Sequence, residues 1–351
     1  MRLSDNYLAV ELSKSDTSAI KGIAILFMLW HHLFLNVTEY GTLTQSLALI
    51  FKVCVALFLF VSGYGLTRQY GSQDKRNVRT TIKFLLRRFI NFFLPFWFCF
   101  FLVALVGNIC GYSFQDAYPA TRNTLKCFAL DFWGQMGYDS YLKPWWFNKM
   151  IIQLYLIFPI LYLIVYNKYS AVAGLIAIAV LQLFAKSLPG NVFFFVEGGT
   201  PAFYLGMLCA RHRVGSVFRS KSFRTALSIV SCLMIIIVSL LLIKVVKDPY
   251  QAILLRAIMA LCIVCAFKSC RSHLASVLEY VGKYAAIMYL THVLFLKIIP
   301  QIVYYPKYSV LVFALFFAIC LGAAIFIAWL EKVLRYDKLR LTLVNRLNCL
   351  L

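Results

Sequence analysis

Three side chains in the first apolar segment combine charge with proton-transfer chemistry. Lys21 opens the run KGIAILFMLWHH, which is apolar up to His31 and His32. In an α-helix, with a rise of about 1.5 Å and a turn of about 100° per residue, Lys21 and His32 lie roughly 16 Å apart on nearly the same face. His31 points away from that face by about a quarter turn. A cation near a membrane surface can bind an anion, and an imidazole near mid-depth can move a proton, so we interpret Lys21 and His32 as functional and His31 as structural.

Other polar side chains also stand within or beside apolar stretches, and a structural role is the alternative for each. The adjacent Arg87 and Arg88 can bind phosphates bidentately, or they only set the orientation in a membrane. Glu197 can orient an imidazole or hold a sugar hydroxyl, or it is an exposed loop acid. His292 is the second candidate histidine. Snorkelling or pairing is the alternative role for Lys52, Lys149, Gln153 and Arg256.

The elements that must position these residues are membrane helices. The chain has 351 residues, of which 62% are hydrophobic and 14% charged, too apolar a composition for an ordinary soluble protein. We predict an all-α, polytopic helix bundle that forms one membrane-embedded domain over residues 1–351. The ten predicted spans cover residues 19–37, 43–67, 84–108, 146–166, 170–186, 191–210, 225–245, 250–268, 277–299 and 309–333.

The net charge of +22 fits a membrane protein better than a nucleic-acid partner. The basic residues lie in short segments between apolar runs and do not follow one amphipathic face. Most of them fall on the side that both termini share, so the positive-inside rule predicts cytoplasmic termini in a cell membrane. We expect the lipid bilayer as a partner, no nucleic acid and no metal.

The segment 109–144 is the longest predicted outer loop, and loops of this length are usually functional or disordered. It carries carboxylates and aromatic rings and leads into Trp145 and Trp146. These side chains suit a polar, sugar-like partner, although aromatic residues at a membrane boundary also act as interface anchors. We expect a substrate to be selected here, with contacts from Trp145, Trp146, Gln153 and His292.

Several of these stretches, taken in chain order, resemble the motifs of the membrane acyltransferase 3 family. The similar stretches are Lys21 to His32, Phe58 to Tyr64 (FLFVSGY), Arg87 to Pro95 (RRFINFFLP), Trp145 to Phe147 with Phe158 and Pro159, and Val281 to His292 (VGKYAAIMYLTH). The resemblance covers nearly the whole chain. It departs from the family pattern at Lys21, where arginine is common, and at Asn91, where a further arginine often stands.

The resemblance implies a fold of ten spans and the transfer of an acyl group, commonly acetyl, from cytoplasmic acyl-coenzyme A to a carbohydrate hydroxyl. The acceptor would be a cell-envelope or exported carbohydrate. By the same resemblance, His32 is the catalytic histidine with Lys21 as its partner, and Arg87 and Arg88 contact the acyl-CoA donor. We add Glu197 as a further catalytic candidate. The alternatives are a transporter of a sugar or lipid-linked sugar, and a non-catalytic membrane scaffold.

Overall fold

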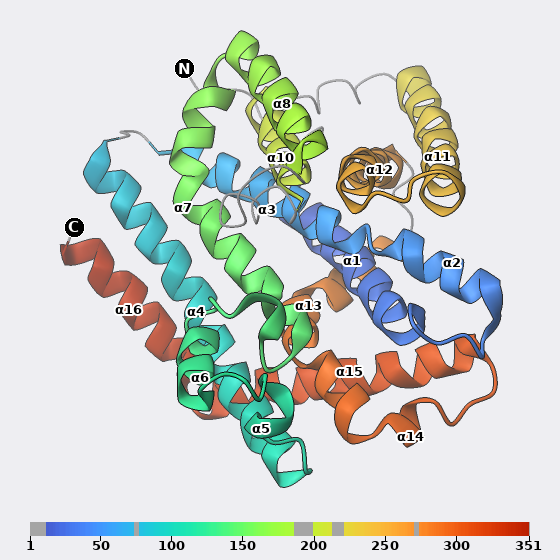
Figure 1. Ribbon diagram of the computed structural model, residues 1–351. Helices are drawn as coiled ribbons and strands as arrows, with labels where there is room; N and C mark the ends of the chain where they lie inside the picture. Colours follow the sequence, from blue (N-terminus) through green and yellow to red (C-terminus); the bar gives the residue numbers. More distant parts are fainter. Residues whose placement is uncertain (1–11, 74–76, 186–198, 213–220, 270–273, 351) are drawn as a thin grey trace. The chain divides into compact units, whose positions relative to one another are not determined.

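The computed structural model describes residues 12–73, 77–185, 199–212, 221–269 and 274–350, and within these ranges the regular structure is helical (Figure 1). The elements are α1 (Lys14–Phe34), α2 (Gly41–Phe51), α3 (Cys54–Gly71), α4 (Val78–Ile109), α5 (Phe114–Ala117), α6 (Thr124–Phe132), η2 (Gly137–Asp139), η3 (Lys143–Trp145), α7 (Trp146–Tyr166), α8 (Lys168–Leu183), α10 (Thr200–Arg211), α11 (Lys221–Lys244), α12 (Pro249–Ser269), α13 (Leu274–Ile298), α14 (Pro300–Val303), α15 (Ser309–Val333) and α16 (Tyr336–Leu350).

Eight helical stretches in the described residues are long and apolar enough to cross a membrane, which confirms an all-α, polytopic membrane protein. Of the other two predicted spans, one is a shorter helix and one is only partly described. The span predicted at 170–186 is the 16-residue helix α8. Part of the span predicted at 191–210 lies outside the described residues, and its described part is the 12-residue helix α10. The cytoplasmic position of the termini stays a prediction.

The predicted second span at 43–67 is not one continuous helix. It consists of α2 and α3, which are separated by a break at Lys52 and Val53. Neither glycine nor proline stands between residues 42 and 62, so the sequence carries no conventional signal for this break. The segment 109–144, which the sequence predicts as a loop, is partly helical, since it contains α5, α6 and η2.

The chain forms two compact units, and each combines segments that are distant in sequence. The first unit contains residues 1–73 and 160–283, and the second contains residues 74–159 and 284–351. The prediction of one domain over the whole chain stays a prediction, and each unit is described by itself.

Glycines allow helix backbones to approach closely in the first unit. A Cβ atom at Gly63 of α3 would overlap the carbonyl oxygen of Phe203 in α10, and one at Gly206 of α10 would overlap the carbonyl oxygen of Phe60 in α3. The α3–α10 crossing therefore depends on a reciprocal pair of residues without side chains, a common arrangement in membrane helix packing.

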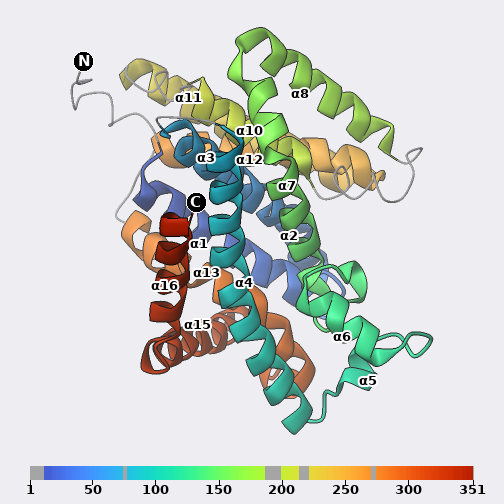
Figure 2. The same cartoon turned by 90° about the vertical axis from the view of Figure 1, so that its left-hand side faces the viewer.

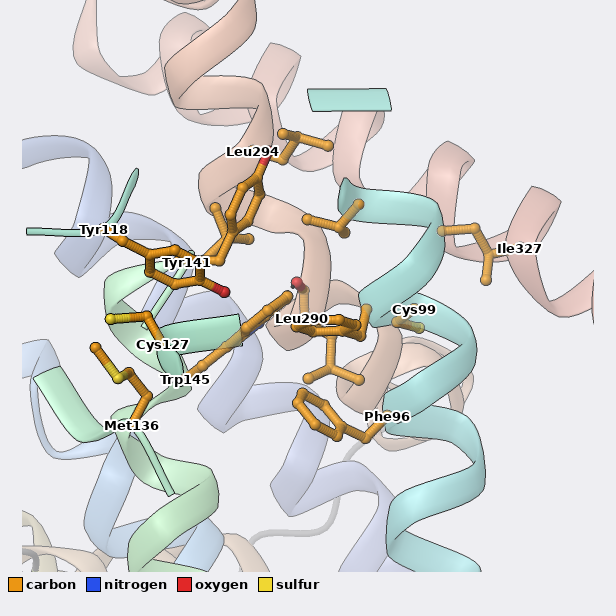
Figure 3. Close-up of a cluster of buried hydrophobic side chains, with 13 residues drawn as sticks. Phe96, Cys99, Tyr118, Cys127, Met136, Tyr141, Trp145, Leu290, Leu294 and Ile327 are labelled. Atoms are coloured by element: carbon orange, nitrogen blue, oxygen red, sulfur yellow. Dashed lines mark hydrogen bonds between the residues drawn. The ribbon is translucent and has the colours of Figure 1, made fainter. Parts of the chain in front are cut away.

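A buried aromatic cluster holds the second unit together (Figure 3). Phe96 and Phe100 of α4 each place their ring centroids 5.5 Å from the ring of Trp145. The Trp145 indole N–H donates to the carbonyl oxygen of Leu290 in α13 at 3.0 Å, so the segment before α7 is tied to α13. In the same unit α16 runs beside α4 (Figure 2). There the hydroxyl of Tyr336 donates to the carbonyl oxygen of Leu94 at 3.1 Å.

Candidate active site

Helix α1 carries both histidines of the first candidate motif in its last turn. The helix begins with a capping box, in which the Ser13 hydroxyl accepts from the backbone N–H of Asp16 at 3.0 Å and the Asp16 carboxylate accepts from the backbone N–H of Ser13 at 2.9 Å. It ends at Phe34, three residues before the predicted end of the span at residue 37. The position of His32 near mid-depth in a membrane stays a prediction.

The two adjacent imidazoles have different surroundings. Their ring centroids are 5.1 Å apart and their planes are inclined by 67°. His31 is buried, with 6% of its surface exposed, and its Nδ1 lies 2.6 Å from the carbonyl oxygen of Ala48. Since a carbonyl only accepts, Nδ1 of His31 carries the hydrogen. His32 is only half-buried.

His31 caps a helix end that the break between α2 and α3 creates. Ala48 belongs to the last four residues of α2, whose carbonyl groups have no partner within the helix. A histidine side chain can satisfy such a carbonyl. The contact thus connects α1 to α2 and gives His31 the structural role expected for it.

Arg256 of α12, for which the sequence suggested a snorkelling or paired side chain, forms no salt bridge in the part of the chain that the structure describes. Only 9% of its surface is exposed, and its buried Nε atom has no hydrogen-bond partner. Arg256 lies within electrostatic range of His31 and of Cys54. A buried guanidinium within electrostatic range of His31 is suited to hold an anionic group.

The remaining cations lie at two further places. Lys21 is exposed on α1, at the other end of the apolar run from His32. Arg87 and Arg88 are both half-buried in the first third of α4. The guanidinium carbon of Arg88 lies 5.4 Å from the ring centroid of Phe84, one turn earlier on the same helix. Arg87 and Arg88 lie within electrostatic range of each other, so they concentrate positive charge of the kind that phosphate binding requires.

His292 lies in α13 of the second unit and is buried, with 1% of its surface exposed. Its Nδ1 donates to the carbonyl oxygen of Tyr289 at 2.9 Å and lies 3.2 Å from that of Met288. The hydroxyl of Tyr289 donates to the carbonyl oxygen of Pro144 at 2.8 Å, and it lies 3.2 Å from the amide oxygen of Asn148. The turn of α13 that carries His292 is therefore tied to the start of α7.

The predicted substrate contacts on α7 and just before it differ in exposure. Trp145 is buried with 1% exposed, so its contacts are those of the aromatic core. Trp146 is half-buried, and its ring stacks on Tyr138 with the centroids 5.3 Å apart. Gln153 is half-buried, and its Oε1 atom has no hydrogen-bond partner in the described part of the chain. Glu197 lies outside the described residues.

Asp131 of α6 is a buried carboxylate within the segment 109–144 that the sequence predicts as an outer loop. None of its surface is exposed. Its Oδ2 atom accepts from the backbone N–H of Tyr141 at 2.6 Å and from the hydroxyl of Tyr118 at 3.2 Å. Burial raises the pKa of Asp131 to about 6, although these hydrogen bonds oppose the shift. No local pattern in the sequence distinguishes it from Asp116 and Asp139.

A comparison with known protein families identifies the family of this chain. A family model described as an acyltransferase domain matches residues 17–330. The chain belongs to the acyltransferase 3 family. The matched region of this acyltransferase 3 protein extends from α1 into α15 and includes every candidate residue named above. Among curated proteins and among solved structures, none matches the chain.

Within the acyltransferase 3 fold described here, the candidates fall into two groups. The first unit contains Lys21 and His32, and it brings His31, His32 and Arg256 into one region. The second unit contains the other described candidates: Arg87, Arg88, Trp145, Trp146, Gln153 and His292. In that unit the structure ties Trp145 and the segment carrying His292 to each other through α13.

Proposed function

We propose that this membrane acyltransferase transfers an acyl group, most simply acetyl, from cytoplasmic acyl-CoA to a hydroxyl of a cell-envelope or exported carbohydrate. Membership of the acyltransferase 3 family supports the reaction class, and the span-length helices support a site within a membrane. The cytoplasmic membrane is the proposed location, because acyl-CoA is made in the cytoplasm and the acceptor lies at or beyond the other face.

His32 serves as the general base in this proposal. It takes the proton of the acceptor hydroxyl while the hydroxyl oxygen attacks the thioester carbonyl carbon. The tetrahedral intermediate then collapses, the carbon–sulfur bond breaks, and the coenzyme sulfur leaves with the proton that His32 returns. The products are the carbohydrate ester and free coenzyme A, so atoms and charge balance without a metal or a redox partner.

The difference between the two adjacent histidines is the observation that carries the proposal. His31 is buried and its Nδ1–H is used to cap α2 through Ala48, whereas the neighbouring His32 is only half-buried. His32 is thus the imidazole of the pair that a substrate can approach. The buried positive charge of Arg256 in the same region would stabilise the negative oxygen of the tetrahedral intermediate.

The donor would be held by its phosphates. Arg87 and Arg88 offer two adjacent planar donor groups, and Lys21 offers a single ammonium group. We expect Arg87→Ala and Arg88→Ala together to weaken acyl-CoA binding strongly, since each removes charge-assisted hydrogen bonds. Unchanged affinity for acyl-CoA in the double variant would remove both arginines from the donor site.

The testing experiment measures acyl transfer in purified membranes that contain acetyl-labelled coenzyme A and a crude envelope glycan. Wild-type protein should transfer label to the glycan, and His32→Ala should reduce the rate by about 10²- to 10⁴-fold, the usual contribution of a general base. His212→Ala is the matched control, because His212 lies at the end of α10 and contacts the carbonyl oxygen of Val165 at 2.9 Å. Equal transfer by folded wild-type and His32→Ala protein would discard the His32 mechanism.

The same preparation separates the enzyme from the two alternatives. A transporter would move a sugar or lipid-linked sugar across sealed vesicles without acyl-CoA, and a scaffold would neither move it nor modify it. Transfer of label that requires the donor distinguishes the acyltransferase from both.

A further inference from the structure

A cavity of about 340 Å³ lies in the second unit, and it is lined by the segment between α4 and α7 together with two residues of α13, Val293 and Lys297. This volume is at the lower end of the range of about 300–1,000 Å³ for ligand pockets. The cavity is thus large enough for a small polar ligand. Its lining residues belong to the second unit, whereas Lys21 and His32 belong to the first.

Tyrosine rings form much of the cavity wall, and their positions are fixed by hydrogen bonds. The hydroxyl of Tyr141 donates to the carbonyl oxygen of Tyr112 at 2.6 Å, and the hydroxyl of Tyr112 donates to the carbonyl oxygen of Tyr141 at 3.1 Å. The hydroxyl of Tyr118 donates to buried Asp131, which also accepts from the backbone N–H of Tyr141. Asp131 is therefore a positioning residue, which fixes Tyr118 and Tyr141 in the cavity wall through hydrogen bonds.

The charged groups of the lining balance one another. The cavity is lined by the carboxylates of Asp116 and Asp139 and by the ammonium groups of Lys143 and Lys297, so its formal charge is zero. Asp139 is also paired with Arg122, whose Nη1 lies 2.8 Å from its Oδ2. Such a site does not favour the multiple phosphates of a coenzyme, because its lining carries no net positive charge.

Asp116 and Tyr138 are the side chains placed to meet a ligand. The Oδ2 atom of Asp116 accepts from the backbone N–H of Ser113 at 2.8 Å and from its hydroxyl at 2.6 Å. Asp116 is exposed, and a carboxylate with two oxygens can accept further hydrogen bonds. Tyr138 is 48% exposed at the cavity and stacks on Trp146, the predicted acceptor contact. A carboxylate that accepts hydroxyl hydrogen bonds beside an aromatic face matches a molecule with polar edges and an apolar C–H face.

We propose that this cavity binds one unit of a neutral carbohydrate, with Asp116 accepting from sugar hydroxyls and the tyrosine rings packing on the C–H face of the sugar. The proposal rests on the proposed function in that it assigns the carbohydrate acceptor to a particular part of the chain. A carbohydrate site would account for the charged side chains and the hydrogen-bonded tyrosines of the cavity wall, which anchoring at a membrane interface does not require.

Direct binding tests the cavity without depending on catalysis. Full-length protein in lipid nanodiscs is titrated with methyl β-D-glucopyranoside, methyl β-D-galactopyranoside and methyl N-acetyl-β-D-glucosaminide, and saturation-transfer NMR reports binding. We expect saturable binding of at least one glycoside, and we expect Asp116→Asn and Tyr138→Ala to weaken it at least fivefold. Both side chains are exposed, so the variants should unfold at the wild-type temperature.

The controls alter the same residue types elsewhere. Tyr169→Ala changes a tyrosine that is 87% exposed on α8, and Asp337→Asn changes the first-turn acid of α16. Glycoside binding that no cavity variant weakens, or that the controls weaken equally, would overturn the proposal. The absence of saturable binding by every glycoside, or tighter binding of coenzyme A or a uronic acid than of a neutral glycoside at this cavity, would also overturn it.

Acyl transfer then separates the two proposals. If wild-type protein transfers label to the glycan and Asp116→Asn transfers it equally well, the cavity proposal fails and the proposed function stands. If wild-type protein binds glycosides but transfers no label, the proposed function fails and the cavity remains a carbohydrate site.

Discussion

Lys268 of α12 forms an ion pair with Asp16 in the first turn of α1, with Nζ and Oδ2 2.7 Å apart. The carboxylate side chain is completely buried, and the ammonium side chain is 13% exposed. Asp16 also completes the capping box of α1 through Ser13. One buried carboxylate therefore stabilises the start of the helix that carries His32 and connects that helix to α12.

We expect Lys268→Met to lower the stability of the protein by about 3–5 kcal/mol, because the variant leaves the buried charge of Asp16 without its counter-ion. The double variant Asp16→Asn with Lys268→Met should recover part of that loss. Thermal unfolding in detergent measures both effects, and Lys307→Met is a control at an exposed lysine. Unfolding of Lys268→Met at the wild-type temperature would show that the pair contributes nothing.

The α3–α10 crossing predicts opposite effects for two glycines of the same helix. Gly63→Ala should destabilise the protein by about 1–3 kcal/mol, because its Cβ would overlap the carbonyl oxygen of Phe203. Gly65→Ala should be neutral or stabilise by up to about 1 kcal/mol, since no atom lies within 4 Å of the added carbon and alanine favours a helix. Unfolding temperatures of the two variants test this difference, which should vanish if the helices can separate without cost.

Variants of His31 and His32 should affect stability and activity differently. His31→Ala leaves the carbonyl of Ala48 without its donor, so we expect a loss of about 1–3 kcal/mol of stability. His32→Ala should unfold close to the wild-type temperature while it loses acyl transfer. Measuring unfolding and transfer on the same samples decides the matter, and a larger loss of stability in His32→Ala than in His31→Ala would contradict the assignment of roles.

Replacing Arg256 should raise the stability of the protein and lower its activity. Its guanidinium is buried and forms no salt bridge in the described part of the chain, so Arg256→Met should raise the unfolding temperature by removing an uncompensated charge. The same variant should reduce acyl transfer at least tenfold if that charge stabilises the reaction intermediate. Arg224→Met, at an exposed arginine of α11, should change neither quantity. Full transfer activity in Arg256→Met would remove Arg256 from the mechanism.

Asp131 should make stability depend on pH in a defined window. Because burial raises its pKa from 3.8 to about 6, the folded chain keeps a proton that the unfolded chain releases between these values. The contribution of Asp131 to the free energy of unfolding should thus fall as pH rises through this window, by about 3 kcal/mol at most, and stay level above it.

Asp131→Asn isolates that contribution, since an amide oxygen can still accept from Tyr141 and Tyr118 but does not titrate. Unfolding temperatures between pH 4 and pH 7 should fall more steeply for wild-type protein than for the variant. Parallel curves for the two proteins would show that Asp131 titrates in its ordinary range.

Local patterns were sufficient to predict much of the fold. Hydropathy over about 20 residues located the apolar helices, since a membrane span requires that length whatever it packs against. The run from Lys21 to His32 lies within α1 as predicted. Hydropathy did not reveal the break at Lys52, because the chain is apolar on both sides of it and residues 42–62 contain neither glycine nor proline.

The surroundings of individual side chains could not be predicted in the same way. His31 and His32 are neighbours of one residue type, and only the packing of α2 against α1 determines that the carbonyl of Ala48 meets His31. Likewise, the sequence places Asp116, Tyr138 and Lys297 far apart, and the folded segment after α4 collects them around one cavity.

The sequence by itself determined that this is a helical membrane protein of the acyltransferase 3 family, because hydropathy and motif spacing are local properties of the chain. Only the tertiary structure decided which histidine is buried, that Arg256 lies within electrostatic range of His31, and where a cavity forms. Those features depend on contacts between residues that are distant in sequence, and their geometry is set by side-chain packing that no periodic pattern encodes.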